Sequence, residues 1–251
     1  MKRLLVVGTS HAGALKIAHD AEPSVLSDGF DVDFFALPIP SFVRAQIRRN
    51  GEFALVDKGP HVARFKKTAM KLNGRTGVQL RDYDHVVVVG LGSIAPEYLN
   101  LAQEVSIDGL RETEGEFRLS LPAHHAFVTD MLERSWRRFD TTRAPDVAFW
   151  QVAPPRPSGS TTAPDGVTKD ERLRDVLDDM LEANHRIAQE KGLRPIPQPK
   201  ETITSSGQTH ARFATGARRL SGEVRPDDFT HMNGEYGAHV LREISRHLRQ
   251  R

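Results

Sequence analysis

Short apolar runs recur along the chain between stretches with helical periodicity, and this alternation limits the fold more than any other feature of the sequence. These strand-like segments lie at 4–7, 31–37, 85–89, 147–152 and near 193–196. The second also contains Asp31 and Asp33, and the fifth contains Arg194 and Pro195. The first and third stop at a glycine, and the second and fourth are closed by prolines, as expected at strand ends. Runs of this length are too short for most helices but suit strands that are buried in a sheet.

Helical spacing of apolar residues lies between and after these runs, at 12–18, 126–139, 168–191 and 235–248. Thr168 and Glu171 predict a capping box for the third helix, and Gly192 stands where a C-terminal glycine is expected. Strands that alternate with helices favour a parallel sheet with helices on both faces. No sharp change of composition divides the chain, so we expect a single α/β domain over residues 1–251.

The composition excludes several classes of site and partner. The 251 residues include no cysteine, which rules out disulfides, thiolate metal sites and cysteine nucleophiles. Lys and Arg outnumber Asp and Glu by 35 to 33, and the net charge of +2 gives no reason to expect a nucleic-acid partner. No stretch approaches the roughly 18 apolar residues of a membrane span, and the first apolar run is too short for a signal peptide. We therefore expect a cytoplasmic protein without a membrane partner.

A serine, a histidine and an aspartate stand where a nucleophile and its base are expected. Ser10 follows the first run in Gly8-Thr9-Ser10-His11, at a turn into a helix whose free N–H groups can stabilise an oxyanion. Asp228 lies three residues before His231, close enough to face it across one turn. A histidine that takes a serine proton needs an acceptor on its other ring nitrogen. Taken one at a time, these residues are better explained as helix caps and packing residues.

Together the two motifs resemble those of the SGNH hydrolase superfamily, also called GDSL-like esterases, and their layout covers nearly the whole chain. The resemblance implies a three-layer flavodoxin-like fold with a central, mainly parallel, five-stranded sheet. It also implies that Ser10 is the nucleophile, His231 the general base and then acid, and Asp228 the carboxylate that orients His231. Such chemistry requires no metal and no organic cofactor, and its substrate would be an O-acyl ester of a carbohydrate or a small molecule.

Two oxyanion features of that family are altered in this chain, and one is the glycine after the second strand, which has no obvious equivalent in 36–40. The family usually has Gly-x-Asn-Asp after the third strand, with the asparagine donating to the oxyanion, whereas this chain has Gly90-Leu91-Gly92-Ser93. The loss of one such donor typically costs about 3 to 4 kcal/mol of transition-state stabilisation. We therefore expect either an oxyanion hole rebuilt from the backbone at Ser10 and in the Gly90–Gly92 turn, or an activity that is weak, specialised or absent.

His11 and Asn233 are further candidates for contact with the substrate. His11 directly follows Ser10, and Asn233 lies two residues after His231. The alternatives are a solvent-facing helix position for His11 and capping of the final helix for Asn233.

Three other functions stay open. The first is a sugar O-acyltransferase, because SGNH-like enzymes of that kind, some with a Gly-Thr-Ser opening, move an acyl group through the same serine. The second is a non-catalytic relative that binds a glycan or another partner. The third is a dinucleotide-binding protein. Gly90-Leu91-Gly92-Ser93-Ile94-Ala95 fits the Gly-x-Gly-x-x-Ala form of a dinucleotide-binding turn. A metal site is not expected, because the adjacent His124 and His125 should not point both rings the same way on a helix.

Overall fold

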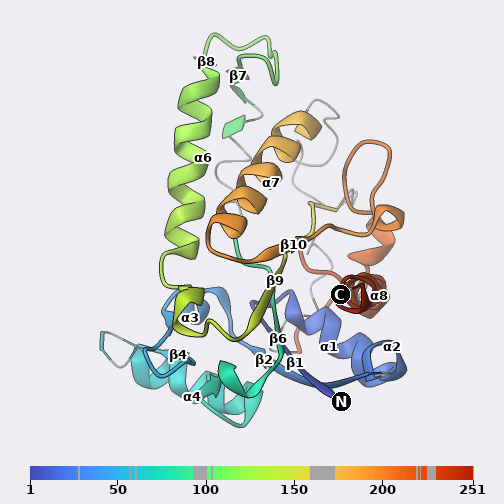
Figure 1. Cartoon of the computed structure of the whole chain (residues 1–251). Coiled ribbons are helices and arrows are strands. Elements are labelled where there is room, and N and C mark those ends of the chain that lie inside the picture. The colour runs from blue at the N-terminus through green and yellow to red at the C-terminus, as the bar shows by residue number, and fades with distance from the viewer. Residues whose placement is uncertain are drawn as a thin grey trace.

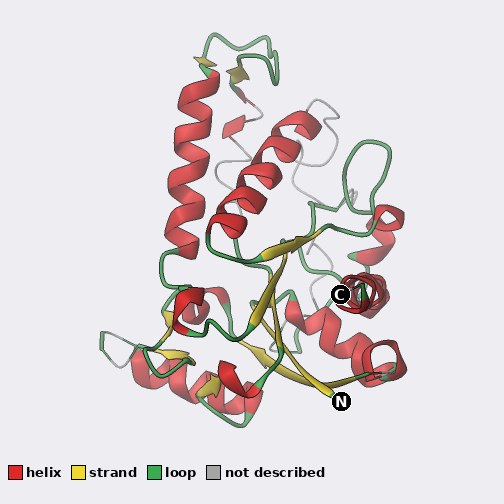
Figure 2. Ribbon diagram, in the orientation of Figure 1, coloured by secondary structure: helices red, strands yellow, loops and turns green. Residues whose placement is uncertain are grey.

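A five-stranded parallel sheet forms the centre of the protein (Figure 2). The computed structural model describes residues 1–27, 29–56, 58–59, 61–92, 101–102, 104–158, 173–218, 220, 222–224 and 230–250. The strands of the central sheet are β1 (Lys2–Gly8), β2 (Phe30–Ala36), β6 (His85–Val89), β9 (Ala148–Val152) and β10 (Arg194–Ile196). Each of these five strands overlaps one of the five predicted segments, with bounds that differ by no more than two residues.

The strand order in space is β2-β1-β6-β9-β10, and every neighbouring pair is parallel. Numbered along the chain, this is the order 2-1-3-4-5 of doubly wound flavodoxin-like sheets. The chain has a flavodoxin-like fold. In such sheets the ligand site lies beyond the carboxyl ends of the strands, where the chain switches direction across the sheet. Here that point lies beyond the adjacent carboxyl ends of β1 and β6. The last paired residues of these two strands are Gly8 and Val89.

Helices cover both faces of the sheet (Figure 1). One face packs against α1, α2 and α8, and its buried residues include Leu4, Val6, Leu15 and Leu241. The opposite face packs against α4, α6 and α7. The helices are α1 (Ala12–Ala21), α2 (Ser24–Ser27), α3 (Ile39–Phe42), α4 (Val62–Asn73), α6 (Leu121–Trp136), α7 (Leu173–Glu190) and α8 (Gly234–Arg249), with single 3₁₀ turns at Leu80–Asp82, Thr141–Arg143, Lys200–Thr202 and Ala211–Phe213. In the part of the chain that the structure describes, no helix combines the length and the apolar character needed to cross a membrane.

The predicted helix over 126–139 is shifted in the structure. Helix α6 begins at Leu121, because the Ser120 side chain accepts a hydrogen bond from the Ala123 N–H and Pro122 occupies the first turn. It ends at Trp136 rather than at residue 139. The apolar spacing therefore identified the helix, while its capping residues set its start. The capping box expected at Thr168 and Glu171 lies outside the described residues, which resume at α7.

The helix predicted over 235–248 is confirmed as α8. Two small sheets were not predicted. Strands β3 (Ala45–Ile47), β4 (Glu52–Leu55) and β5 (Gly77–Gln79) form an antiparallel sheet, and β7 (Ser106–Ile107) pairs in parallel with β8 (Arg118–Leu119). Strands of two to four residues are too short to show a period in the sequence.

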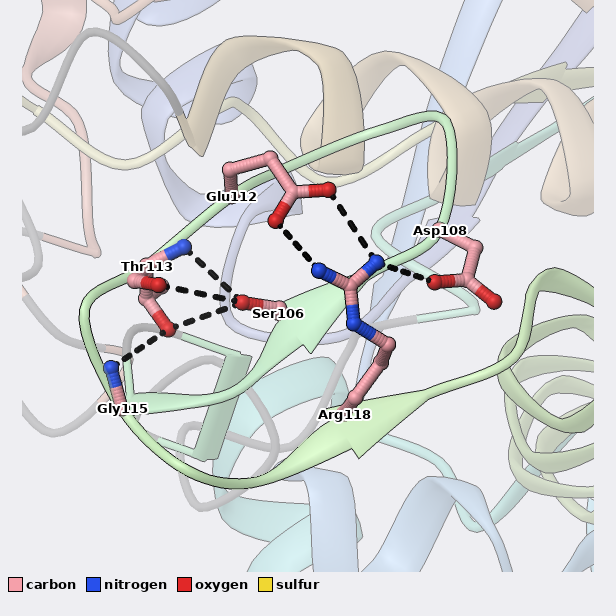
Figure 3. A network of polar contacts seen from close by, with 6 residues as sticks. All are labelled: Ser106, Asp108, Glu112, Thr113, Gly115 and Arg118. Atoms are coloured by element: carbon pink, nitrogen blue, oxygen red, sulfur yellow. Dashed lines mark hydrogen bonds and ion pairs between the residues drawn. The ribbon is translucent and has the colours of Figure 1, made fainter.

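Polar contacts hold the β7–β8 segment together (Figure 3). The Arg118 guanidinium lies 2.8 Å from an Asp108 carboxylate oxygen and 2.7 Å from one of Glu112. The Ser106 hydroxyl accepts a hydrogen bond of 2.9 Å from the Thr113 N–H. Figure 1 shows this segment at the end of α6 farthest from β1. We therefore assign it no part in the candidate site.

Candidate active site

Ser10 and His231 meet at the carboxyl edge of the sheet. Ser10 Oγ lies 2.8 Å from His231 Nε2, although 221 positions separate the two residues. Ser10 stands in the turn between β1 and α1, and His231 stands just before α8. Both residues are partly buried, so the pair is held by the protein while one side stays open to a ligand. A serine hydroxyl within hydrogen-bond reach of an imidazole nitrogen is the arrangement needed for base-assisted attack.

The packing of α8 on α1 explains why these distant residues meet. A Cβ atom built on Gly237 in α8 would lie 2.5 Å from the carbonyl carbon of Ala14 in α1 and 3.0 Å from the Leu15 nitrogen. Only a glycine at this position lets the two helix backbones approach so closely. Because Ser10 precedes α1 and His231 precedes α8, this approach brings their side chains to the same edge of the sheet.

The second ring nitrogen of His231 faces Thr230. Thr230 Oγ1 lies 3.3 Å from His231 Nδ1. The sequence did not single out Thr230, because it stands inside the Asp-x-x-His motif at a position that the motif leaves open. Asp228, the predicted orienting carboxylate, lies outside the described residues. Its role therefore stays a prediction.

His11 lies beside the dyad of Ser10 and His231. Its ring stacks on the His231 ring with centroids 5.6 Å apart and planes inclined by 21°. The side chain is partly buried, and it does not cap α1. This orientation favours the prediction that His11 faces the site over a solvent-facing helix position.

Asn233 caps the final helix. Its Oδ1 accepts a hydrogen bond of 3.1 Å from the Tyr236 N–H at the start of α8. Its Nδ2 donates to the carbonyls of Arg212 at 2.8 Å and Thr215 at 3.0 Å. Both Nδ2 protons are thus used within the chain, which confirms the capping alternative and leaves the amide no proton to donate to a substrate.

The loop after β6 supplies one backbone donor fewer than expected. The Gly90 N–H donates to the Val152 carbonyl at 2.9 Å, so it continues the β6–β9 ladder and cannot also bind an oxyanion. The N–H groups of Ser10 and Gly92 have no hydrogen-bond partner among the described residues. These two N–H groups are therefore the backbone donors that remain from the prediction. Residues 93–95 of the dinucleotide-type pattern lie outside the described part of the chain.

A buried threonine joins the two loops of the site. Thr9 is 2% exposed, and its hydroxyl donates to the Gly90 carbonyl at 3.3 Å. The Thr9 N–H also donates to the Val89 carbonyl at 3.0 Å. The sequence placed Thr9 in the Gly-Thr-Ser opening but gave it no role. The structure shows that it ties the turn containing Ser10 to the end of β6.

The expectation that the rings of His124 and His125 do not point the same way was wrong. His124 Nε2 and His125 Nε2 lie 3.0 Å and 2.9 Å from the two carboxylate oxygens of Asp179 on α7. Adjacent histidines on α6 can therefore reach the same carboxylate, each through its Nε2. Burial lowers the pKa of His124 more than its contact with Asp179 raises it. No group of three or more residues suited to holding a metal ion exists among the described residues, here or elsewhere.

Comparisons with known proteins give distant likenesses only. No protein-family model matches the chain, and no curated protein matches it in sequence. The periplasmic domain of a lipopolysaccharide acetyltransferase from Salmonella ser. Paratyphi A has a TM-score of 0.46 at 12% identity, covering 98% of this chain and 83% of that one. A GDSL-like lipase from Bacteroides thetaiotaomicron has a TM-score of 0.43 at 10% identity, covering 99% of this chain and 88% of that one.

At such TM-scores and identities the likenesses assign no activity to this chain. The fold is established by the strand order of the sheet, and the chemistry has to be argued from the residues of the site.

Proposed function

We propose that this protein is a serine-dependent enzyme that hydrolyses an O-acyl ester of a carbohydrate or a small molecule. The hydrogen bond between Ser10 Oγ and His231 Nε2 carries the proposal. A serine hydroxyl is a weak nucleophile until a neighbouring base takes its proton, and His231 is within reach to do so. The position of the pair, beyond the carboxyl ends of β1 and β6, is where flavodoxin-like sheets bind ligands.

The reaction would proceed in two halves. His231 Nε2 takes the Ser10 proton while Oγ attacks the ester carbonyl carbon, and the oxyanion forms near the Ser10 and Gly92 N–H groups. The carbonyl then reforms, the alcohol leaves with the proton held by His231, and the acyl group stays on Ser10. A water molecule attacks this acyl-serine, gives its proton to His231 and releases the acid. Ser10 recovers its proton from His231 in the last step.

Turnover of p-nitrophenyl acetate and p-nitrophenyl octanoate tests the proposal. We expect Ser10→Ala to abolish turnover, since the nucleophile is lost, and wild-type protein stopped early in the reaction to carry the acyl group on Ser10 by intact mass. Ser135→Ala is the matched control, because among the described residues the Ser135 hydroxyl donates to the Met131 carbonyl within α6 and to no other group. Turnover that survives in Ser10→Ala would refute the proposal.

The same assay separates hydrolysis from acyl transfer. Hydrolysis releases p-nitrophenol steadily in buffer alone, because water removes the acyl group from Ser10. A transferase would release one equivalent rapidly and continue only when a sugar hydroxyl is supplied. The absence of both the burst and the adduct would favour a protein that binds its ligand without turning it over.

A further inference from the structure

A buried carboxamide occupies the space next to Gly92, in the loop that follows β6. Asn184 belongs to α7 and is 2% exposed. A Cβ atom built on Gly92 would lie 2.5 Å from both Cγ and Nδ2 of Asn184, and the φ of Gly92 is +82°. The Asn184 side chain therefore fills the volume into which any side chain at position 92 would extend.

The carboxamide of Asn184 is held at both ends. Its Oδ1 accepts a hydrogen bond of 2.9 Å from the indole N–H of Trp136, which is fully buried on α6. Its Nδ2 donates to the Leu91 carbonyl at 3.3 Å. Two opposed bonds fix the rotamer of the amide, because the oxygen and nitrogen cannot exchange places without losing both. Asn184 thus connects α6 and α7 to the loop after β6.

The other side of this loop contacts the turn that carries Ser10. A Cβ atom on Gly90 would lie 2.6 Å from His11 Cδ2 and would also overlap the Thr9 hydroxyl. Thr9 in turn donates to the Gly90 carbonyl at 3.3 Å. Residues 90–92 are therefore packed between Asn184 on one side and Thr9 with His11 on the other. The His11 ring stacks on His231, so the contact continues to the base of the dyad.

We propose that Asn184 is a positioning residue for Ser10 and His231. It presses the Gly90–Gly92 segment against Thr9 and His11, and this contact fixes the place where Ser10 Oγ meets His231 Nε2. Asn184 is too deeply buried to touch a substrate, so its effect reaches the reaction only through the loop. The inference rests on the proposed function, since it assigns Asn184 a role in that same site.

Moving the carboxamide from α7 to the loop tests this role. The variants are Asn184→Ala, Gly92→Asn and the double variant, with the rate of Ser10 labelling by a fluorophosphonate as the readout. We expect Asn184→Ala to label at least tenfold more slowly, because the loop loses its support. Gly92→Asn should also label slowly, because two carboxamides compete for one space. The double variant should recover to within about threefold of wild type, since asparagine tolerates a positive φ and places a carboxamide in the vacated volume. A labelling rate above that of wild type would show that an asparagine at position 92 donates to the oxyanion instead, and would refute the shared-volume explanation.

A control separates positioning from a general loss of stability. Met180 lies one turn before Asn184 on α7 and is fully buried in the core on that face of the sheet. Met180→Ala should lower Tm while leaving the labelling rate of the folded protein close to wild type. With p-nitrophenyl acetate, Asn184→Ala should lower kcat and leave KM within twofold.

The outcomes distinguish this inference from the proposed function. If wild-type protein labels at Ser10 but Asn184→Ala labels no more slowly than Met180→Ala, the role of Asn184 is refuted and the proposed function stands. If Asn184→Ala labels slowly and the double variant labels no faster than either single variant, then the two carboxamides do not share one volume, and that part of the inference is refuted. If wild-type protein does not label at Ser10, the proposed function fails, and the catalytic role of Asn184 fails with it.

Discussion

The close contact between α1 and α8 predicts that Gly237→Ala separates the two residues of the dyad. The added methyl group would meet the carbonyl of Ala14 and lie 3.0 Å from the Leu15 nitrogen. Both are backbone atoms, so no side-chain rotation can relieve the overlap. Helices α1 and α8 must move apart, and each begins within three residues of a member of the dyad, Ser10 or His231.

The magnitude follows from two opposing effects. Alanine in a helix interior is favoured over glycine by about 0.5 to 1 kcal/mol. Overpacking of a well-packed contact typically costs about 1 to 3 kcal/mol, and a contact with backbone falls at the upper end. We therefore expect a net loss of about 1 to 2 kcal/mol in the free energy of unfolding. For a chain of this size that corresponds to a fall in Tm of about 2 to 8 °C.

Gly13→Ala is the matched control, because Gly13 lies in α1 and is also helical. A Cβ atom there would lie 3.4 Å from Leu220 Cδ2, an ordinary van der Waals distance. This variant should keep or raise Tm, since it gains helix propensity without overlap. Thermal unfolding followed by circular dichroism, together with fluorophosphonate labelling, should show Gly237→Ala less stable and less reactive than Gly13→Ala. Equal Tm and equal labelling for the two variants would refute the role of the helix contact.

Three further predictions concern the site and the core. Gly90→Ala should abolish labelling of Ser10, because the added methyl group would overlap Thr9 and His11 in the turn that carries Ser10. Gly74→Ala should keep normal labelling, because Gly74 has a similar positive φ but open space around it. Similar labelling rates for the two variants would contradict this prediction. Burial lowers the pKa of both His124 and His185 from the ordinary value of 6.5. As the pH falls below about 6.5, these histidines are protonated in the unfolded chain before they are in the folded protein, so the free energy of unfolding decreases. Equal urea midpoints at pH 7.5 and pH 5.5 would contradict this prediction. Asp228→Asn should retain the circular dichroism spectrum of the wild type but lose turnover by orders of magnitude, and full activity would remove Asp228 from the proposed triad.

The sheet was predictable because each strand carries its own signal. The valines of β6 and the apolar residues of β1 and β9 are buried on both faces, and such runs stand out in a sequence whatever surrounds them. The start of α6 was misplaced because Ser120 and Pro122 set it, rather than the apolar spacing. Strands β3 to β5 and the β7–β8 pair were missed because strands of two to four residues are too short to show a period in the sequence.

The site was predictable only where it followed a motif. Ser10 and His231 were named from the two ends of the chain, and the structure places them in contact, while their catalytic roles stay a prediction. Asn184 gave no signal, since it is one polar residue on the buried side of a helix, 92 positions after the glycine it packs against. Thr9 and Thr230 were likewise visible only once the strands and loops were in place. Contacts between side chains and the backbone of another element leave no periodic trace in a sequence.

Covalent labelling with a fluorophosphonate, followed by intact-mass analysis and mapping of the modified peptide, tests the central claim most directly. The reagent reacts with a serine whose hydroxyl is activated by a neighbouring base, so we expect one adduct on Ser10 of the wild-type protein. Ser10→Ala should carry no adduct, and His231→Gln should react at least about a hundredfold more slowly, because the base is lost. An adduct on another serine, or no adduct on wild-type protein, would contradict the assignment of Ser10 and His231 as nucleophile and base.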